Sequence, residues 1–260
     1  MDLQLEGKRA LVTGGSRGIG KAVARALVAE GARVAIASRT AATVEAAAAE
    51  LGAVGIVVDT TDDASVQAMV ATAVAELGGV DILVNSAAPP ASDGPVLAAS
   101  RTPDDAVRAQ VETKVLGYLR CARAVAPLMT AQGWGRIVNI SGLNARSSAS
   151  LVGSVRNVAV AAMTSALAAE LGPQGVNVTV VHPGMTATER TPRLVAERAA
   201  AQGVDEAEVE RAMGATTTVG RMITGDEVAA VVTFLASPRS VAINGDAIAA
   251  GGGQPGVTYY

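Results

Sequence analysis

Short runs of apolar residues, many of them β-branched, alternate with alanine-rich amphipathic stretches along most of this chain. Continuous apolar runs between helical stretches are typical of parallel strands that are buried on both faces. The alternation therefore predicts an α/β fold, a doubly wound parallel sheet with helices on both faces. Strands are expected at residues 9–13, 33–38, 55–58, 81–85, 135–140 and 176–181, with a last strand at 241–248. Helices are expected at residues 20–30, 41–51, 64–77, 104–129, 155–171 and 226–235.

The chain length fits one domain with one large core. Half of the 260 residues are apolar, and no long linker or low-complexity segment divides them. We therefore expect a single domain over residues 1–260. Residues 185–215 depart from the alternation and include a charged helical stretch from Leu194 to Met213. We expect this insertion to form a small helical cap over the carboxyl ends of the strands, where open α/β sheets bind ligands.

The composition argues against several kinds of partner and binding site. The 21 basic and 24 acidic residues leave a formal net charge of -3, which gives no electrostatic footprint for nucleic acid or an anionic membrane. The single Cys121 excludes an intramolecular disulfide, and one cysteine with one histidine cannot build a zinc site. Apolar runs are interrupted well short of the roughly 20 residues of a membrane span, and Met1 leads directly into Asp2 and Glu6, so we expect neither a span nor a signal segment. We expect a cytoplasmic protein that binds a small molecule and no metal.

A glycine-rich turn joins the first predicted strand to the first predicted helix. It reads Thr-Gly-Gly-Ser-Arg-Gly-Ile-Gly over residues 13–20. In a Rossmann-type site, such glycines allow a tight turn, close approach of the pyrophosphate, and contact between helix and strand. Glycine-rich turns also occur for purely structural reasons, but here strand, turn and helix fall in the required order. The residues expected to bind a dinucleotide in this turn are Gly14, Ser16, Arg17, Gly18, Ile19 and Gly20.

Two arginines bear on the choice of dinucleotide. The second strand ends in Ser38 and Arg39, where a site for NAD(H) usually places an acidic residue. Arg39 offers a guanidinium to a 2′-phosphate, and Arg17 can reach the same corner. NADP(H) is therefore favoured over NAD(H), although two solvated arginines at a loop edge are the alternative interpretation. Asp59 and Thr60, after the third strand, are expected near the adenine.

Several further motifs, in the same order along the chain, resemble the short-chain dehydrogenase/reductase family. They are Asn85-Ser86-Ala87-Ala88, Ile137-Val138-Asn139-Ile140-Ser141, Pro183-Gly184 with Thr188, Val219-Gly220-Arg221 and Ile243-Asn244-Gly245. The resemblance implies that Asn85 and Ala87 lie beside the cofactor, and that Pro183, Gly184 and Thr188 belong to the loop at its nicotinamide end. It also implies a homodimer or homotetramer.

The same resemblance breaks at the catalytic residues. The family has a Tyr general acid/base and a Lys four residues later, and these positions fall at Gly153 and Asn157. The family's Ser falls at Gly142, with Ser141 beside it, and its Asn falls at Lys114. The chain has three tyrosines, Tyr118, Tyr259 and Tyr260, and none lies near position 153 in sequence.

Three residues are candidates for the missing acid/base group. Lys114, if desolvated, has a lowered pKa and can polarise or protonate a substrate oxygen; alternatively it extends into solvent or fills the space left at Asn157. Ser141 can donate a hydrogen bond to substrate or simply satisfy the backbone. His182 has a suitable ordinary pKa, although a lone histidine at a strand end is more often structural. Arg156 lies next to Asn157 and faces either the pocket or a neighbouring subunit.

These observations favour an NADP(H)-dependent oxidoreductase that acts on a carbonyl or an activated double bond with a remodelled acid/base site. Two alternatives remain open at this point. One is a catalytically inactive protein that binds NADP(H) as a sensor or scaffold. The other is a lyase or isomerase that uses the same pocket without net redox chemistry.

Overall fold

The core of the structure, a computed structural model that describes residues 1–89 and 96–255, is a seven-stranded parallel sheet. Its order is β3-β2-β1-β4-β5-β6-β9. The strands are β1 (Arg9–Thr13), β2 (Arg33–Ser38), β3 (Val54–Val57), β4 (Ile82–Asn85), β5 (Gly135–Ile140), β6 (Val176–Pro183) and β9 (Ala247–Ala250). The order reverses between β1 and β4, and a crevice at the carboxyl ends of such strands is where doubly wound sheets bind ligands.

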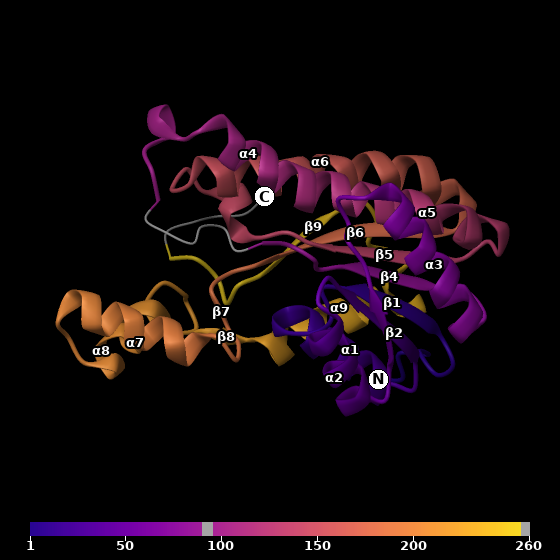
Figure 1. Ribbon diagram of the computed structural model, residues 1–260, viewed down its shortest axis with the longest axis horizontal. Helices are drawn as coiled ribbons and strands as arrows, with labels where there is room; N and C mark the ends of the chain where they lie inside the picture. The colour runs from indigo at the N-terminus through magenta and orange to yellow at the C-terminus, as the bar shows by residue number, and fades with distance from the viewer. Residues whose placement is uncertain (90–95, 256–260) are drawn as a thin grey trace.

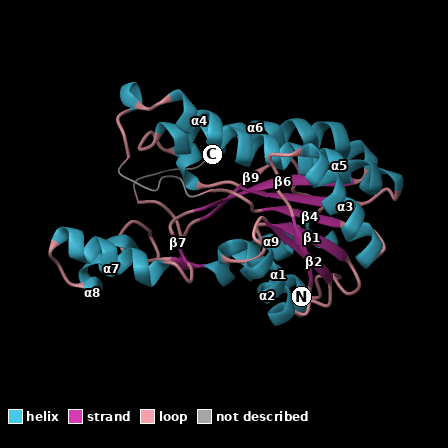
Figure 2. Cartoon of the chain, viewed as in Figure 1, coloured by secondary structure: helices cyan, strands magenta, loops and turns pink. Residues whose placement is uncertain are grey.

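Helices cover both faces of the sheet, as Figures 1 and 2 show. On one face lie α1 (Gly18–Ala29), α2 (Ala41–Leu51) and α9 (Gly225–Leu235), which pack their apolar sides on β1, β2 and β4. On the other lie α3 (Asp63–Leu77), α5 (Gly117–Ala131) and α6 (Leu151–Leu171). Because aromatic residues make up only 2% of the chain, both cores consist almost entirely of Ala, Val, Leu, Ile and Met. The predicted α/β class and doubly wound sheet are confirmed.

Most predicted boundaries agree with the structure to within a few residues, and the last strand is the main exception. It was expected at residues 241–248, but β9 is Ala247–Ala250. The preceding residues are held beside β6 in a turn, because Asn244 Oδ1 accepts a hydrogen bond from the Val178 amide and Gly245 has a φ of 78°. Regular pairing with β6 therefore starts only after this turn.

The long helix expected at residues 104–129 is interrupted. Helix α4 (Asp104–Gln110) passes into a wider π-helical turn (Val111–Leu116), and α5 follows from Gly117. Such turns often occur at functional sites, since the inserted residue redirects the side chains around it. Lys114 lies in this turn, and its side chain is buried.

The expected cap consists of two short helices rather than one stretch. Helices α7 (Thr191–Gln202) and α8 (Glu206–Gly214) are separated at Gly203, whose left-handed conformation ends α7. The helices pack on each other through Val195, Ala199, Val209 and Met213, and they project from the body of the molecule (Figure 1). Two short strands, β7 (Thr186–Ala187) and β8 (Ile223–Thr224), pair at the base of the projection.

One helical segment among the described residues, Leu151–Gln174, has the length and hydropathy of a membrane span, although charged and polar residues interrupt it. It includes α6, which packs on the sheet and buries Val160, Leu167 and Leu171. The core helix of a globular protein passes the same test, so the segment is weak evidence for a membrane.

Candidate active site

The glycine turn after β1 has the close contacts that a dinucleotide-binding turn requires. A Cβ atom at Gly20 would lie 2.3 Å from the carbonyl oxygen of Gly14, so only glycine fits there. Helix α1 begins at Gly18 and has no side-chain cap of its own. Instead, the Gly18 amide donates to Glu189 Oε1 at 2.9 Å. A carboxylate thus already lies at this helix N-terminus, which is the kind of site that a pyrophosphate takes.

A cavity of about 430 Å³ extends from this turn along the carboxyl ends of β1, β2 and β4. It contains both arginines predicted to bind cofactor, Arg17 and Arg39. Most of the predicted cofactor residues line it: Gly14, Ser16, Arg17, Gly18, Ile19, Gly20, Ser38, Arg39, Thr60, Ala87, Gly184 and Thr188. The structure therefore brings together residues from five separate parts of the sequence.

The end of the cavity beside β2 fits a phosphorylated ribose. The hydroxyl of Ser38 is buried and has no hydrogen-bond partner, and Arg39, Thr40 and Thr43 line the cavity around it. A buried hydroxyl without a partner costs free energy, and a phosphate oxygen that accepts a hydrogen bond from the hydroxyl removes this cost. The residues present thus fit a nicotinamide dinucleotide, NAD(P)(H).

Three predicted cofactor residues do not line this cavity. Asp59 directs its carboxylate back to Thr61, accepting from the amide at 2.9 Å and the hydroxyl at 2.8 Å, and these bonds lower its pKa. Asn85 is fully buried and donates to Tyr118 O and Asn139 Oδ1, so its role in the described structure is to join β4 to β5 and α5. Pro183 lines a second cavity instead.

Lys114 is held at the centre of the site. Its Nζ donates to the carbonyl oxygen of Ser141 and to Oδ1 of Asn157, each at 2.9 Å, and the residue is only 3% exposed. Burial, followed by the positive charge of Arg156, lowers the pKa of Lys114 well below its ordinary value. The side chain lines the cofactor cavity, so the alternative in which it extends into solvent is wrong.

Gly142 and Gly153, where the resemblance places the family's Ser and Tyr, leave no empty space beside them. A Cβ at Gly142 would lie 2.9 Å from Nδ2 of Asn157, and one at Gly153 would lie 2.7 Å from Nδ2 of Asn144. Two asparagine amides therefore occupy the space beside these glycines. Asn144 follows β5 in a short helical turn (Leu143–Arg146), and this turn brings its amide against the first turn of α6.

Ser141 and His182 both satisfy backbone groups. The Ser141 hydroxyl donates to the Asn157 carbonyl at 3.1 Å, so its proton is directed away from a substrate oxygen. His182 Nδ1 accepts from the Gly142 amide at 3.3 Å, and the ring is 2% exposed. Burial, then the positive charges of Arg146 and Lys114, lower the pKa of His182 to about 4. A histidine that is buried, neutral and hydrogen-bonded in this way is structural, as its sequence context suggested.

Tyr118 does not replace the absent tyrosine. Its hydroxyl donates to the Ile140 carbonyl at 3.0 Å, and burial raises its pKa far above the ordinary value. Although Tyr118 lines the cofactor cavity, a phenol with such a raised pKa keeps its proton at neutral pH. Tyr259 and Tyr260 lie outside the described residues.

A second cavity of about 430 Å³ adjoins the first and meets it at Ser141, Arg156 and Gly184. One wall is the turn with Asn144, and another is the loop that starts at Pro183. Thr216 and Thr217, just beyond the cap helices, close a further side. Its volume and position are those of a small-molecule substrate pocket next to a cofactor. Among the described residues, no group of acidic, cysteine or histidine side chains is arranged to hold a metal.

Sequence reasoning missed several residues of the site. Thr40 directly follows Arg39 and Thr43 lies in the first turn of α2, and the rule that ligands lie at strand carboxyl ends would have included them. Glu189 follows Thr188 in the loop already singled out. The contact between Asn144 and Gly153 carried no signal in the sequence, because only the packed helix brings the two residues together.

Comparison with known proteins agrees with this geometry. The family model described as short chain dehydrogenase matches residues 8–199. The chain is 38% identical over 252 residues to the short-chain reductase protein NovJ of Streptomyces niveus, covering 95% of this chain and 93% of that protein. It is 36% identical to a sorbitol dehydrogenase of Cereibacter sphaeroides, covering 92% and 93%. The crystal structure of L-sorbose reductase from Gluconobacter frateurii, complexed with NADPH and L-sorbose, superimposes with a TM-score of 0.90 at 26% identity, covering 99% and 100%.

Proposed function

Since this chain belongs to the short-chain dehydrogenase/reductase family, we propose that it is an NADP(H)-dependent oxidoreductase with a remodelled acid/base site, acting on a carbonyl or an activated double bond. The observation that carries the proposal is the buried Lys114, which lines the cofactor cavity beside the residues shared with the substrate cavity. Membership of the family implies an NAD(P)(H) cofactor and small-molecule substrates.

The preference for NADP(H) rests on the ribose end of the cofactor cavity. Ser38 provides a buried hydroxyl without a partner, and Arg39 provides a positive charge next to it. A guanidinium and a hydroxyl are suited to bind a phosphate. Neither can replace the acidic residue that accepts hydrogen bonds from the two ribose hydroxyls in a site for NAD(H). The loop of Gly184 and Thr188 lines the opposite part of the cavity, where the nicotinamide would lie by the resemblance.

Lys114 is the residue best placed to move a proton. When bound, the nicotinamide supplies or accepts a hydride. Reduction of a carbonyl leaves negative charge on oxygen, which then needs a proton. Two of the three tetrahedral positions of Nζ are used by donation to Ser141 and Asn157, so one position remains for a proton or a lone pair. A lowered pKa brings that nitrogen closer to the range in which it can give and take a proton at neutral pH.

A double bond conjugated to a carbonyl fits the same arrangement. A hydrogen bond from Lys114 to the carbonyl oxygen stabilises the enolate that hydride addition produces. The amides of Asn144 and Asn157, which line the substrate cavity, add neutral donors for such an oxygen. The redox proposal therefore does not require a tyrosine at position 153. An inactive sensor remains the alternative of another class, favoured if cofactor binds without turnover.

Further parts of the proposal concern assembly and organisation. The apolar residues Leu116, Leu151, Val155 and Val158 are exposed along α6 and the neighbouring π-helical turn, and they suit a homodimer or homotetramer interface. We infer a single domain in which Met185, the first residue of the 185–215 insertion, lines the substrate cavity, while α7 and α8 project from the body of the molecule. A cytoplasmic location remains an expectation from composition.

The test is a titration of the purified protein with NADPH and NADH, followed by cofactor consumption with ketones and enones. NADPH binding that is tighter than NADH binding, with turnover of one substrate class, supports the proposal. The variant Lys114→Met should then lower turnover by about 100-fold or more while NADPH affinity changes little. Lys8→Met is the matched control, because Lys8 directly precedes the amino end of β1 and lines neither cavity. Binding of neither cofactor contradicts the proposal, and binding without turnover favours the sensor.

A further inference from the structure

Arg156 is a buried cation on the wall of the substrate cavity. It lies on α6, one residue before Asn157, and is 7% exposed. Its side chain lines both cavities, at the place where they meet. A guanidinium remains positively charged in proteins, so its burial carries a large desolvation cost unless an anion lies nearby.

The described residues provide Arg156 with neutral partners. Its Nη1 donates to the carbonyl oxygen of Pro89 at 3.1 Å and to Oε1 of Gln110. Both contacts come from the same nitrogen and fix the orientation of the group. Nε is buried and has no hydrogen-bond partner. The edge of the guanidinium that carries Nε is therefore fixed in orientation but has no hydrogen-bond acceptor.

The surroundings are suited to an anion. Among the described residues that line the substrate cavity, Arg156 is the one charged residue, and none is acidic. The other polar side chains there, such as Asn144, Ser147, Thr216 and Thr217, are neutral hydrogen-bonding groups. Lys114 and Arg156 both line the cofactor cavity, and the charge of Arg156 contributes to the lowered pKa of Lys114.

From these contacts we infer that the substrate cavity takes an anionic compound, whose carboxylate binds the Nε edge of Arg156 while its reacting carbonyl or double bond faces Lys114. The substrate class is thus an oxo acid or an unsaturated acid of a size that fits about 430 Å³. The inference rests on the proposed function for the reacting group, but the carboxylate site is measurable without any turnover. A planar carboxylate matches the fork of a guanidinium, and the ion pair offsets the desolvation of both groups.

An anion at this place has two possible sources, a substrate carboxylate or a phosphate of the cofactor. Saturating the protein with NADP⁺ separates them, because the cofactor then already occupies its own cavity. The probes are benzoate and benzamide, which have nearly the same shape and differ in charge. Their binding is measured by isothermal titration calorimetry on the protein saturated with NADP⁺.

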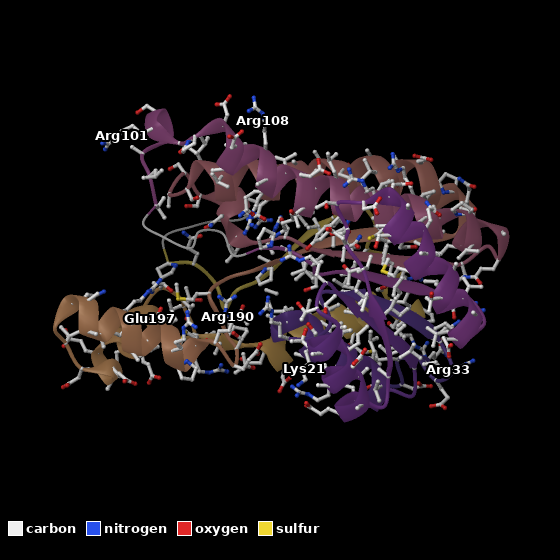
Figure 3. The ribbon with its side chains drawn as sticks, viewed as in Figure 1. Lys21, Arg33, Arg101, Arg108, Arg190 and Glu197 are labelled. Carbon is white, nitrogen blue, oxygen red and sulfur yellow. The ribbon has the colours of Figure 1, made fainter. Side chains whose placement is uncertain are left out.

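We expect benzoate to bind at least about tenfold more tightly than benzamide, since charge-assisted hydrogen bonds are roughly twice as strong as neutral ones. Arg156→Gln should remove that difference and leave the affinity for NADP⁺ unchanged. Arg33→Gln is the control, because Arg33 lies at the amino end of β2 and far from the cap residues Arg190 and Glu197 (Figure 3). If Arg156→Gln does not fold, Arg156→Lys keeps the charge without the fork and should still weaken benzoate binding.

Three results overturn the inference. One is benzoate that binds no more tightly than benzamide, and another is a preference for benzoate that survives in both Arg156 variants. The third is a loss of NADP⁺ affinity in Arg156→Gln with benzoate binding intact, which assigns the anion to the cofactor. Failure of the proposed function is a different result, since it is the absence of NADP(H) binding by the unaltered protein.

Discussion

The Nζ atom of Lys114 lies 2.9 Å from Oδ1 of Asn157, in a contact between the π-helical turn before α5 and the first half of α6. By the resemblance, the family has asparagine at the first of these positions and lysine at the second. We interpret the pair as an exchange of the two residue types across one contact. The exchange keeps one amine and one amide in the same buried space, and it moves the amine from α6 to the opposite wall.

A double variant with asparagine at position 114 and lysine at position 157 should lose less stability than a variant in which either residue is changed alone. Lys114→Asn leaves the Ser141 carbonyl without its buried donor, and Asn157→Lys adds a second amine beside Lys114 and Arg156. We expect the double variant Lys114→Asn/Asn157→Lys to be more stable than the sum of the single effects indicates, by about 1–3 kcal/mol. Urea denaturation of the four proteins measures this coupling. If the changes in unfolding free energy of the two single variants add up to that of the double variant, the two residues are not coupled and the interpretation is wrong.

Gly153 is expected to be required for packing against Asn144. Alanine normally favours a helix over glycine by up to about 1 kcal/mol, but a Cβ here would lie 2.7 Å from Asn144 Nδ2. Gly153→Ala should therefore lower the free energy of unfolding by about 1–2 kcal/mol. In an Asn144→Ala background the same change should be neutral or stabilising. The prediction fails if Gly153→Ala is equally destabilising in both backgrounds.

Arg39 should determine the preference for NADPH over NADH. Arg39→Gln removes the charge beside the unsatisfied hydroxyl of Ser38, and we expect NADPH affinity to fall by about 10–100-fold while NADH affinity changes little. Fluorescence titration with both cofactors measures the ratio. Arg33→Gln, at the other end of β2, serves as the control. Equal losses of NADPH and NADH affinity would show that Arg39 does not read the 2′-phosphate.

His182 should make the protein less stable in mild acid. Its pKa is about 4 in the folded protein and 6.5 in the unfolded chain, so the unfolded chain binds more protons between these values. Stability is therefore complete above pH 6.5 and falls as the pH drops toward 4, by about 3 kcal/mol in total. Thermal unfolding from pH 7 to 4 should show a smaller decline for His182→Asn, whose amide oxygen can still accept from Gly142. Parallel pH profiles would contradict the assignment.

The glycine turn and the sheet could be predicted because their signals are local. Glycines at positions 14, 18 and 20 follow an apolar strand and begin a helix, so sequence order alone identifies a dinucleotide site. The charge of Arg39 could be placed at the cavity for the same reason, since it directly follows β2. Asp59 does not line the cavity, and its carboxylate accepts hydrogen bonds from Thr61, two residues away, which the motif does not reveal.

The sequence by itself determined the doubly wound sheet, the cofactor turn, and the absence of tyrosine and lysine at positions 153 and 157. These follow from hydrophobic periodicity and residue identity, which are properties of short segments. Only the tertiary structure decided that Lys114 reaches Asn157 and Ser141, that Asn144 lies against Gly153, and that Arg156 stands at the junction of two cavities. The contacts of Lys114 join residues far apart in the chain, and the π-helical turn that directs Lys114 inward forms where α4 and α5 pack on α6. Burial and charge at the site therefore depend on packing, which no local pattern encodes.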